Sequence, residues 1–338
     1  MKKLSKKTKQ NILTVILIVL VVVLYLYKES NSGTQSETES AQPSLYPSQT
    51  YEFSSDNDSI GKLSLSDIPE YTGKGIIEIN ANKPYFTEDE MNEAKTLVYF
   101  EYYGDLDSLG RCTVAYDCLG VETMPVSGAK RGDISEIHPS GWHQRSYDCI
   151  NQNTLMTRTH LAGWMLSAEN ANEKNLISGT RYMNADSMLE YEEMTENYLY
   201  HNKGKHVLYR ITPMYNGDEL VARGILMEAR SVEDNGKSIE YCVYVYNVQP
   251  GIKINYSNGW SDYTGIFFDI SAPSVQVGNL ELYDFEMDMS SHIIHAPQCS
   301  ECKEAAPFKG DIDAASSWPS LGYDICDCVY DMLDAIAA

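Results

Sequence analysis

Alternating hydrophobic and polar positions between residues 206 and 248 predict three consecutive β-strands. The segments are HVLYRITPMY (206–215), ELVARGILMEARSV (219–232) and SIEYCVYVYNV (238–248). Asn216-Gly217 separates the first two, and Asn235-Gly236 precedes the third. Asn-Gly between alternating segments is a strong hairpin signal. The pattern therefore predicts an antiparallel meander.

A helix is predicted just before the meander, over NADSMLEYEEMTENYLYHN (184–202). Its apolar residues recur at helical spacing, at Met188, Tyr191, Met194 and Tyr198. Asn184 or Asp186 is expected as its N-cap. Helix and meander together predict an α+β fold with a central antiparallel sheet flanked by helices.

The N-terminal pattern differs from the rest of the chain. Residues 1–10 carry five lysines, residues 11–27 carry no charge, and residues 28–63 are rich in Ser, Thr, Glu and Gln. These segments are interpreted as a cytoplasmic tail, a transmembrane signal anchor and a disordered stalk. A cleaved signal peptide is the alternative, but no convincing small-residue cleavage site follows. The protein is thus expected in the cell membrane, single-pass, with its bulk outside the cell.

Net charge limits the partners that can be expected. The 338 residues carry a formal charge of -22, which disfavours general attraction to nucleic acid. The acidity is uneven, because fourteen acidic and only two basic residues lie between Ser261 and the C-terminus. The middle of the chain is closer to balance, so the objection is weaker there.

Candidate chemistry is concentrated in TLMTRTHLAGWMLSAENANEKNLISGTRYMN (154–184), which holds a single histidine, His160, and several asparagines. Buried structure has little use for so many amides, since each needs a hydrogen-bond partner. A site for a hard metal ion and a phosphate would use them. Histidine titrates near neutrality and serves as a general base, while Mg²⁺ prefers oxygen ligands. Guanidinium groups bind phosphate, and the candidates are Arg131, Arg158 and Arg181.

Several blocks in order resemble the DNA/RNA non-specific endonucleases, which are His-Me finger enzymes with a ββα-metal site. Besides 154–184, the blocks are YYGDLDSLGRCTVAYDCLG, KRGDISEIHPSGWHQRSYD, HVLYRITPMYNGDELVARGILMEARSVEDNG and VYNVQPGIKINYSNG. The resemblance covers residues 64–260. It implies a metal-dependent, sequence-nonspecific endonuclease acting on DNA and RNA, and the family includes membrane-anchored nucleases of bacteria.

The resemblance also implies residue roles. The family motif Asp-Arg-Gly-His appears here as Thr157-Arg158-Thr159-His160, with His160 as general base. Asn184 falls on the side-chain ligand of Mg²⁺ (or Mn²⁺), Asn175 on the residue that shapes the loop, and Glu192 on a helix carboxylate. The two threonines depart from the motif, which puts the rate in question more than the reaction.

Each role has a plainer alternative. Asn184 could cap the helix, Glu192 could be a solvated or bracing carboxylate, and Arg131 could be a turn residue. His138 and His143 are expected to be structural. A catalytically impaired surface protein that binds nucleic acid or another partner is the main rival function, and a structural protein of the cell envelope is a second. The retention of His160, Asn175 and Asn184 argues against both rivals.

The acidic C-terminal region, 261–338, contains its own cluster of metal-binding residue types. HIIHAPQCSECKEAAPF and GYDICDC resemble a variant of a small zinc-binding module found after extracellular nuclease domains. The candidates are His295, Cys299, Cys302, Cys326 and Cys328. Cys299-x-x-Cys302 with Cys326 and Cys328 could form a tetrahedral thiolate Zn²⁺ site, with His295 as a substitute ligand, and a pair of disulfides is the alternative. Four further cysteines are expected as buried thiols or one disulfide pair: Cys112, Cys118, Cys149 and Cys242.

Overall fold

The structure is a computed structural model that describes residues 63–337. The predicted cytoplasmic tail, the predicted span at 11–27 and almost all of the predicted stalk lie outside the described residues. Within 63–337, no helix is both long and apolar enough to cross a membrane.

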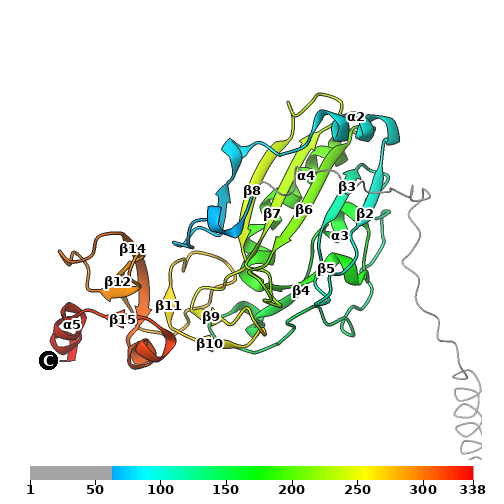
Figure 1. Cartoon of the computed structure of the whole chain (residues 1–338). Coiled ribbons are helices and arrows are strands. Elements are labelled where there is room, and N and C mark those ends of the chain that lie inside the picture. Colours follow the sequence, from blue (N-terminus) through cyan, green and yellow to red (C-terminus); the bar gives the residue numbers. More distant parts are fainter. Residues whose placement is uncertain (1–62, 338) are drawn as a thin grey trace, which may run out of the picture. The chain divides into compact units, whose positions relative to one another are not determined.

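The sheet with the most strands in the described part of the chain has six, in the order β1-β8-β7-β6-β3-β2 (Figure 1). Its strands are β1 (Ile76–Glu78), β2 (Phe100–Tyr103), β3 (Ala115–Leu119), β6 (Val207–Met214), β7 (Gly224–Ser231) and β8 (Glu240–Tyr246). All neighbouring strands in it are antiparallel. The predicted meander, β6 to β8, is confirmed.

Strand β7 begins at Gly224, later than the sequence pattern predicted. The Arg111 guanidinium donates hydrogen bonds to the carbonyl oxygens of Gly217 and Glu219, at 2.7 and 2.8 Å. These carbonyls are therefore satisfied outside the sheet. Residues between β6 and β7 form a loop held by a distant side chain and do not extend the ladder.

Helices cover both faces of the sheet, as predicted (Figure 1). On one face lies α4 (Leu189–His201). Leu199 of this helix and Met188, which precedes it, share a buried core with Tyr209. On the other face α2 (Glu88–Leu97) contributes Met91 to a core that includes Leu208. Tyr209 and Leu208 are consecutive in β6, so they join different cores because side chains alternate across a strand.

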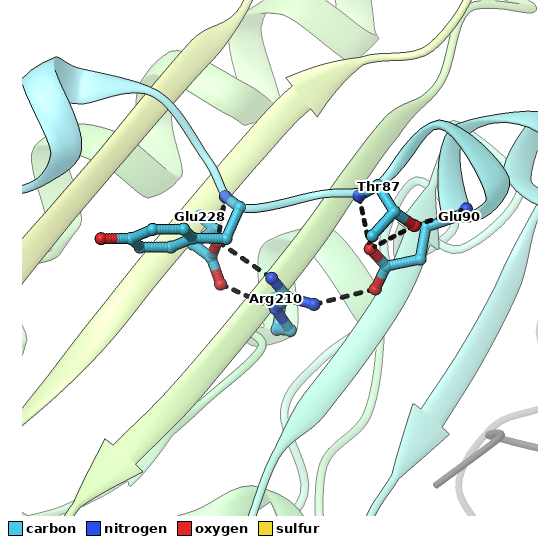
Figure 2. Close-up of polar contacts among 5 residues, drawn as sticks. Thr87, Glu90, Arg210 and Glu228 are labelled. Atoms are coloured by element: carbon cyan, nitrogen blue, oxygen red, sulfur yellow. Dashed lines mark hydrogen bonds and ion pairs between the residues drawn. The ribbon is translucent and has the colours of Figure 1, made fainter. Parts of the chain in front are cut away.

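A buried ion network ties α2 to the sheet (Figure 2). Arg210 of β6 is 0% exposed and donates from Nε and Nη2 to the Glu228 carboxylate, at 2.7 and 3.0 Å. Its Nη1 donates to Glu90 of α2 at 2.9 Å. Glu90 in turn accepts from the backbone N–H of Thr87, which caps the helix. Each carboxylate thus has a partner, and removal of Arg210 would leave two buried acids facing each other.

A second sheet follows, with strand order β11-β14-β12-β13-β15. Its elements are β11 (Ile266–Phe267), β12 (Leu282–Asp288), β13 (Ile293–His295), β14 (Ala305–Asp311), β15 (Asp324–Ile325) and the helix α5 (Asp327–Ala337). Phe285, Phe308 and Trp318 lie in its own buried core. Before it, β9 (Ile252–Ile254) and β10 (Ser261–Tyr263) form a separate antiparallel pair. The second sheet therefore starts at Ile266, close to the predicted beginning of the C-terminal region.

Candidate active site

Two short strands and a helix carry the candidate chemistry. Strand β4 (Met156–His160) pairs antiparallel with β5 (Leu176–Thr180), and His160 lies opposite Leu176. Between them are the short helix α3 (Trp164–Ser167) and a 3-10 turn at Glu173–Asn175. A π-helical turn at Met183–Ser187 then leads into α4. This is the ββα arrangement that the sequence resemblance implied.

His160 is the last residue of β4, and its ring is fixed by a backbone group. Its Nε2 lies 2.9 Å from the carbonyl oxygen of Asn170. Because a carbonyl only accepts, Nε2 carries the proton and Nδ1 keeps its lone pair. Burial lowers the pKa of His160 below its usual 6.5, and the positive charge of Arg131 lowers it further, against the opposing effect of the Asn170 bond. The imidazole is therefore neutral near neutral pH and able to accept a proton.

Asn175 fixes the two residues that follow His160, Leu161 and Ala162. Its side chain is 0% exposed, accepts from the backbone N–H of Ala162 at 2.8 Å and donates to the Ala162 carbonyl at 3.0 Å. The Asn175 carbonyl also accepts from the N–H of Leu161 at 2.8 Å. Three hydrogen bonds from one residue thus fix the turn after β4. Asn175 positions the site and does not reach its surface.

Glu192 of α4 points towards the same turn. A Cβ atom built on Gly163 would lie 2.2 Å from Glu192 Oε1, so only glycine leaves room for the carboxylate. Burial raises the pKa of Glu192 to about 8, while Arg131 acts in the lowering direction and Glu193 and Glu196 act in the raising one. The alternative that Glu192 is merely solvated is wrong, because the side chain is only 6% exposed.

Asn184 does not cap a helix, and neither does Asp186; both N-cap predictions were wrong. The chain is already helical at Tyr182, with φ -60° and ψ -46°, and both residues lie inside the π-helical turn. Thr180 supplies the local cap, since its Oγ1 accepts from the N–H of Met183 at 3.1 Å. Asn184 is half-buried, and its side chain has no hydrogen-bond partner among residues 63–337.

These donors fit a hard divalent cation. Asn184 offers an amide oxygen without a hydrogen-bond partner among the described residues, and Glu192 is a buried carboxyl group whose pKa is raised by burial against the opposing effect of Arg131. Mg²⁺ and Mn²⁺ accept such oxygen ligands, and Mg²⁺ commonly takes only one or two from protein. Asn184 would hold the ion, with Glu192 facing it.

The three candidate arginines are placed differently. Arg131 is exposed, lies over the Trp164 ring at 5.4 Å and acts electrostatically on both His160 and Glu192. Arg158 lies over the Trp142 ring at 4.2 Å and donates from Nε to the Ile137 carbonyl at 2.5 Å.

Arg158 also donates from Nη2 to the Ser135 carbonyl, so it orders the 135–137 loop. Arg181 has a buried Nε with no partner among the described residues, and its charge acts on Asp186. Arg131 is thus the arginine with clear electrostatic access to the histidine.

The two threonines that depart from the family motif bond to each other. Thr157 Oγ1 lies 2.8 Å from Thr159 Oγ1 and donates to the Gly179 carbonyl of β5 at 3.1 Å. They lie on the face of β4 opposite His160, because side chains alternate along a strand. They brace the hairpin from behind the histidine.

Comparison with known proteins finds one matching family model. A family model described as DNA/RNA non-specific endonuclease matches residues 89–233, which include the whole β4–β5–α4 unit. These residues are similar to the DNA/RNA non-specific endonucleases, in agreement with the resemblance seen in the sequence.

Relatives of the endonuclease domain are distant. A curated deoxyribonuclease from Streptococcus dysgalactiae subsp. equisimilis is 25% identical over 207 residues, which are 50% of this chain and 62% of that protein. NucA from Streptococcus agalactiae with no metal bound is 21% identical, covers 61% of this chain and 94% of its own, and has a TM-score of 0.49. The same nuclease with magnesium bound is 23% identical, covers 61% and 92%, and has a TM-score of 0.48. This chain therefore spans less than two thirds of the curated relative.

Sequence reasoning missed three residues of the endonuclease site. The Asn170 carbonyl orients His160, and the Asn170 side chain accepts from the N–H of Gly132 at 3.1 Å, beside Arg131. Trp142 and Trp164 lie under the guanidinium groups of Arg158 and Arg131. The abundance of asparagines in 154–184 was the only signal for Asn170, and nothing pointed to the tryptophans.

His138 and His143 have structural contacts. His138 Nδ1 lies 2.9 Å from the Glu136 carbonyl, and the His143 ring packs on Trp260 with centroids 3.8 Å apart. A cavity of about 650 Å³ lies elsewhere, and its lining includes five tyrosines: Tyr71, Tyr244, Tyr246, Tyr256 and Tyr323. None of the site residues lines that cavity, so it is not part of the endonuclease site.

Outside the residues matched by the family model, the C-terminal candidates come together. The ligand atoms of His295, Cys299, Cys326 and Cys328 all lie within 4.8 Å of one another. Cys302 belongs to a second group, with His295 and Asp288. All eight cysteines are free thiols, and those at 112, 118, 149 and 242 are buried, which fits the buried-thiol alternative.

Proposed function

We propose that this protein is a metal-dependent endonuclease that hydrolyses phosphodiester bonds of DNA and RNA without sequence specificity. The observation that carries the proposal is the orientation of His160, whose Nε2–H is committed to the Asn170 carbonyl. Nδ1 is thereby left as a proton acceptor. The turn that follows His160 is held by hydrogen bonds from Asn175, and Glu192 lies against it.

His160 acts as the general base. A water molecule gives a proton to Nδ1, its oxygen forms a bond to phosphorus, and the bond from phosphorus to the 3'-oxygen breaks. The products are a 5'-phosphate and a 3'-hydroxyl, once the leaving oxygen has taken up a proton from solvent. The lowered pKa of His160 keeps the base unprotonated at neutral pH.

A bound divalent cation would stabilise the negative charge that develops on the phosphate and on the leaving oxygen. Asn184 would hold this ion through its amide oxygen, and Glu192 would orient the water bound to it. Asn175 fixes the backbone of the turn after His160 through its hydrogen bonds to Ala162. The position of the base relative to the ion site would thereby be kept constant.

Arginines supply the local positive charge that the acidic chain otherwise lacks. Arg131 is exposed next to His160 and Glu192, and it would bind a phosphate oxygen. Arg158 holds the 135–137 loop through Nε and Nη2, which leaves Nη1 without a partner among the described residues. Contacts of this kind recognise the backbone and not the bases, which is why no sequence specificity is expected.

The rival interpretation, a catalytically impaired binding protein, rested on Thr157 and Thr159. Their mutual hydrogen bond and the bond to Gly179 brace β4 on the side away from the histidine. A hydroxyl pair thus supports the strand where the family uses aspartate and glycine. This favours a working site over an idle one.

We further propose that the endonuclease domain faces the outside of the cell, anchored by residues 11–27. The support is the uncharged run after five lysines, which keeps the N-terminus in the cytoplasm. Protease treatment of intact cells tests the location, because the domain should be digested while a cytoplasmic marker survives. Protection of the domain in intact cells would contradict it.

The activity is tested on circular plasmid with the purified full-length chain and Mg²⁺, comparing wild type with His160→Ala. Wild type should nick and then degrade the plasmid, EDTA should stop it, and His160→Ala should be inactive. His201→Ala is the matched control, since His201 ends α4 at an exposed position and should keep full activity. An intact plasmid with wild type across several divalent metals, or equal activity in His160→Ala, would overturn the proposal.

A further inference from the structure

Four side chains of the C-terminal sheet converge although they come from three separate segments. His295 ends β13, Cys299 lies in the following turn, and Cys326 and Cys328 flank the start of α5. Their Nδ1 or Nε2 and Sγ atoms lie within 4.8 Å of one another. In a tetrahedral zinc site with Zn–S bonds of about 2.3 Å, the ligand atoms are about 3.7 Å apart. The cluster needs only about 1 Å of contraction to reach that geometry.

His295 provides an independent observation. Its side chain is 3% exposed, yet Nδ1 is buried without a hydrogen-bond partner among the described residues. An imidazole nitrogen left unsatisfied in a protein interior costs about 1–3 kcal/mol. Two disulfides among the four tail cysteines would leave that nitrogen unsatisfied, whereas a metal ion bound through Nδ1 would satisfy it.

Cys302, the expected partner of Cys299 in a Cys-x-x-Cys pair, is not in this group. It lies instead with His295 and Asp288. The Asp288 carboxylate is already occupied, because it accepts from the backbone N–H groups of Ser290, Ser291 and Lys303. The third ligand of the second group is therefore a carboxylate that already serves as acceptor for three backbone N–H groups.

We propose that His295, Cys299, Cys326 and Cys328 bind one Zn²⁺ in a closed, structural Cys3His site, with Cys302 outside the coordination sphere. Four protein ligands leave no position for substrate, so the ion serves to hold α5 against the sheet. The N–H of Ala296 points at Cys328 Sγ at 3.3 Å and would stabilise its thiolate in the complex. Cys326 now donates to Glu301 at 3.7 Å, and this contact would be exchanged for the metal.

The site is tested on the full-length chain purified without chelator, by zinc content and by Co²⁺ substitution. We expect one zinc per chain, and intense visible bands of tetrahedral thiolate-bound Co²⁺. Cys328→Ser and His295→Ala should lose most of the metal, and Cys302→Ser should keep it. His292→Ala is the matched control, since His292 is a half-exposed histidine that precedes β13 and contacts Glu70.

Three results would overturn the inference. One is absence of zinc after incubation with excess Zn²⁺. Another is a non-reduced mass that is lower by two hydrogens per disulfide, which would show paired cysteines. The third is loss of zinc in Cys302→Ser but not in His295→Ala. If Cys328→Ser fails to fold, retention of zinc in Cys302→Ser against its loss in His295→Ala decides the question. None of these readouts depends on nuclease activity.

Discussion

Replacement of Glu192 by glutamine should make the metal-free protein more stable while removing activity. The pKa of Glu192 is raised from 4.5 to about 8, so the folded state holds a proton that the unfolded state releases. Between these values the folded protein binds more protons, and its stability therefore falls as pH rises. At about 1.4 kcal/mol per unit, the loss approaches about 4 kcal/mol by pH 8. A glutamine side chain at this position carries no charge and would not suffer this loss.

Urea unfolding in EDTA, repeated across this pH range, measures the effect. Wild type and Glu192→Gln should be similar near pH 4.5 and diverge as pH rises, with the variant more stable at about pH 8. Glu190→Gln is the control, because Glu190 is an exposed acid on the same helix turn and should show no such divergence. Parallel pH curves for wild type and Glu192→Gln would refute the reasoning, since Glu192 would then ionise as an exposed carboxylate does.

Three other features of the site and the sheet can be tested by substitution or by pH. Asn175→Ala leaves the N–H and carbonyl of Ala162 without their buried partners, which should cost about 1–3 kcal/mol for each group in urea unfolding and lower kcat. Arg210→Met removes the partner of two buried carboxylates and should destabilise the fold by about 3–5 kcal/mol, whereas Arg210→Met combined with Glu90→Leu and Glu228→Leu should recover most of this. The acid limb of kcat/KM against pH should lie below 6.5, because the pKa of His160 is lowered and the base stays unprotonated; an acid limb above 6.5 would contradict this.

The sequence was informative where local chemistry decides local structure. Asn235 and Gly236 both adopt positive φ, 57° and 84°, and they reverse the chain within the loop between Ser231 and Glu240. Strand β3 was not foreseen, because all five of its residues are buried and it shows no alternation. Strand β12 does alternate, with Phe285 and Met287 buried between acidic residues, and the pattern could have predicted it.

Within the site, the sequence located side chains better than it located their contacts. His160, Asn175 and Glu192 lie around the turn that follows β4. The N-cap role of Asn184 failed because capping depends on where the backbone becomes helical, and Thr180 sets that point. Asn170 acts on His160 through a carbonyl that every residue possesses, so its identity gave no signal.

The placement of the site in the chain has a consequence for how the protein can change over evolution. Strand β3 ends at Leu119 and pairs directly with Val207 at the start of β6, so residues 120–206 leave and re-enter the sheet at adjacent points. The entropy of closing such a segment grows only with the logarithm of its length, by about 0.6 kcal/mol for each doubling. Insertions between β3 and β4 should therefore lower the free energy of unfolding of the sheet very little. Loops that meet new substrates can be gained or lost there while the scaffold keeps its register.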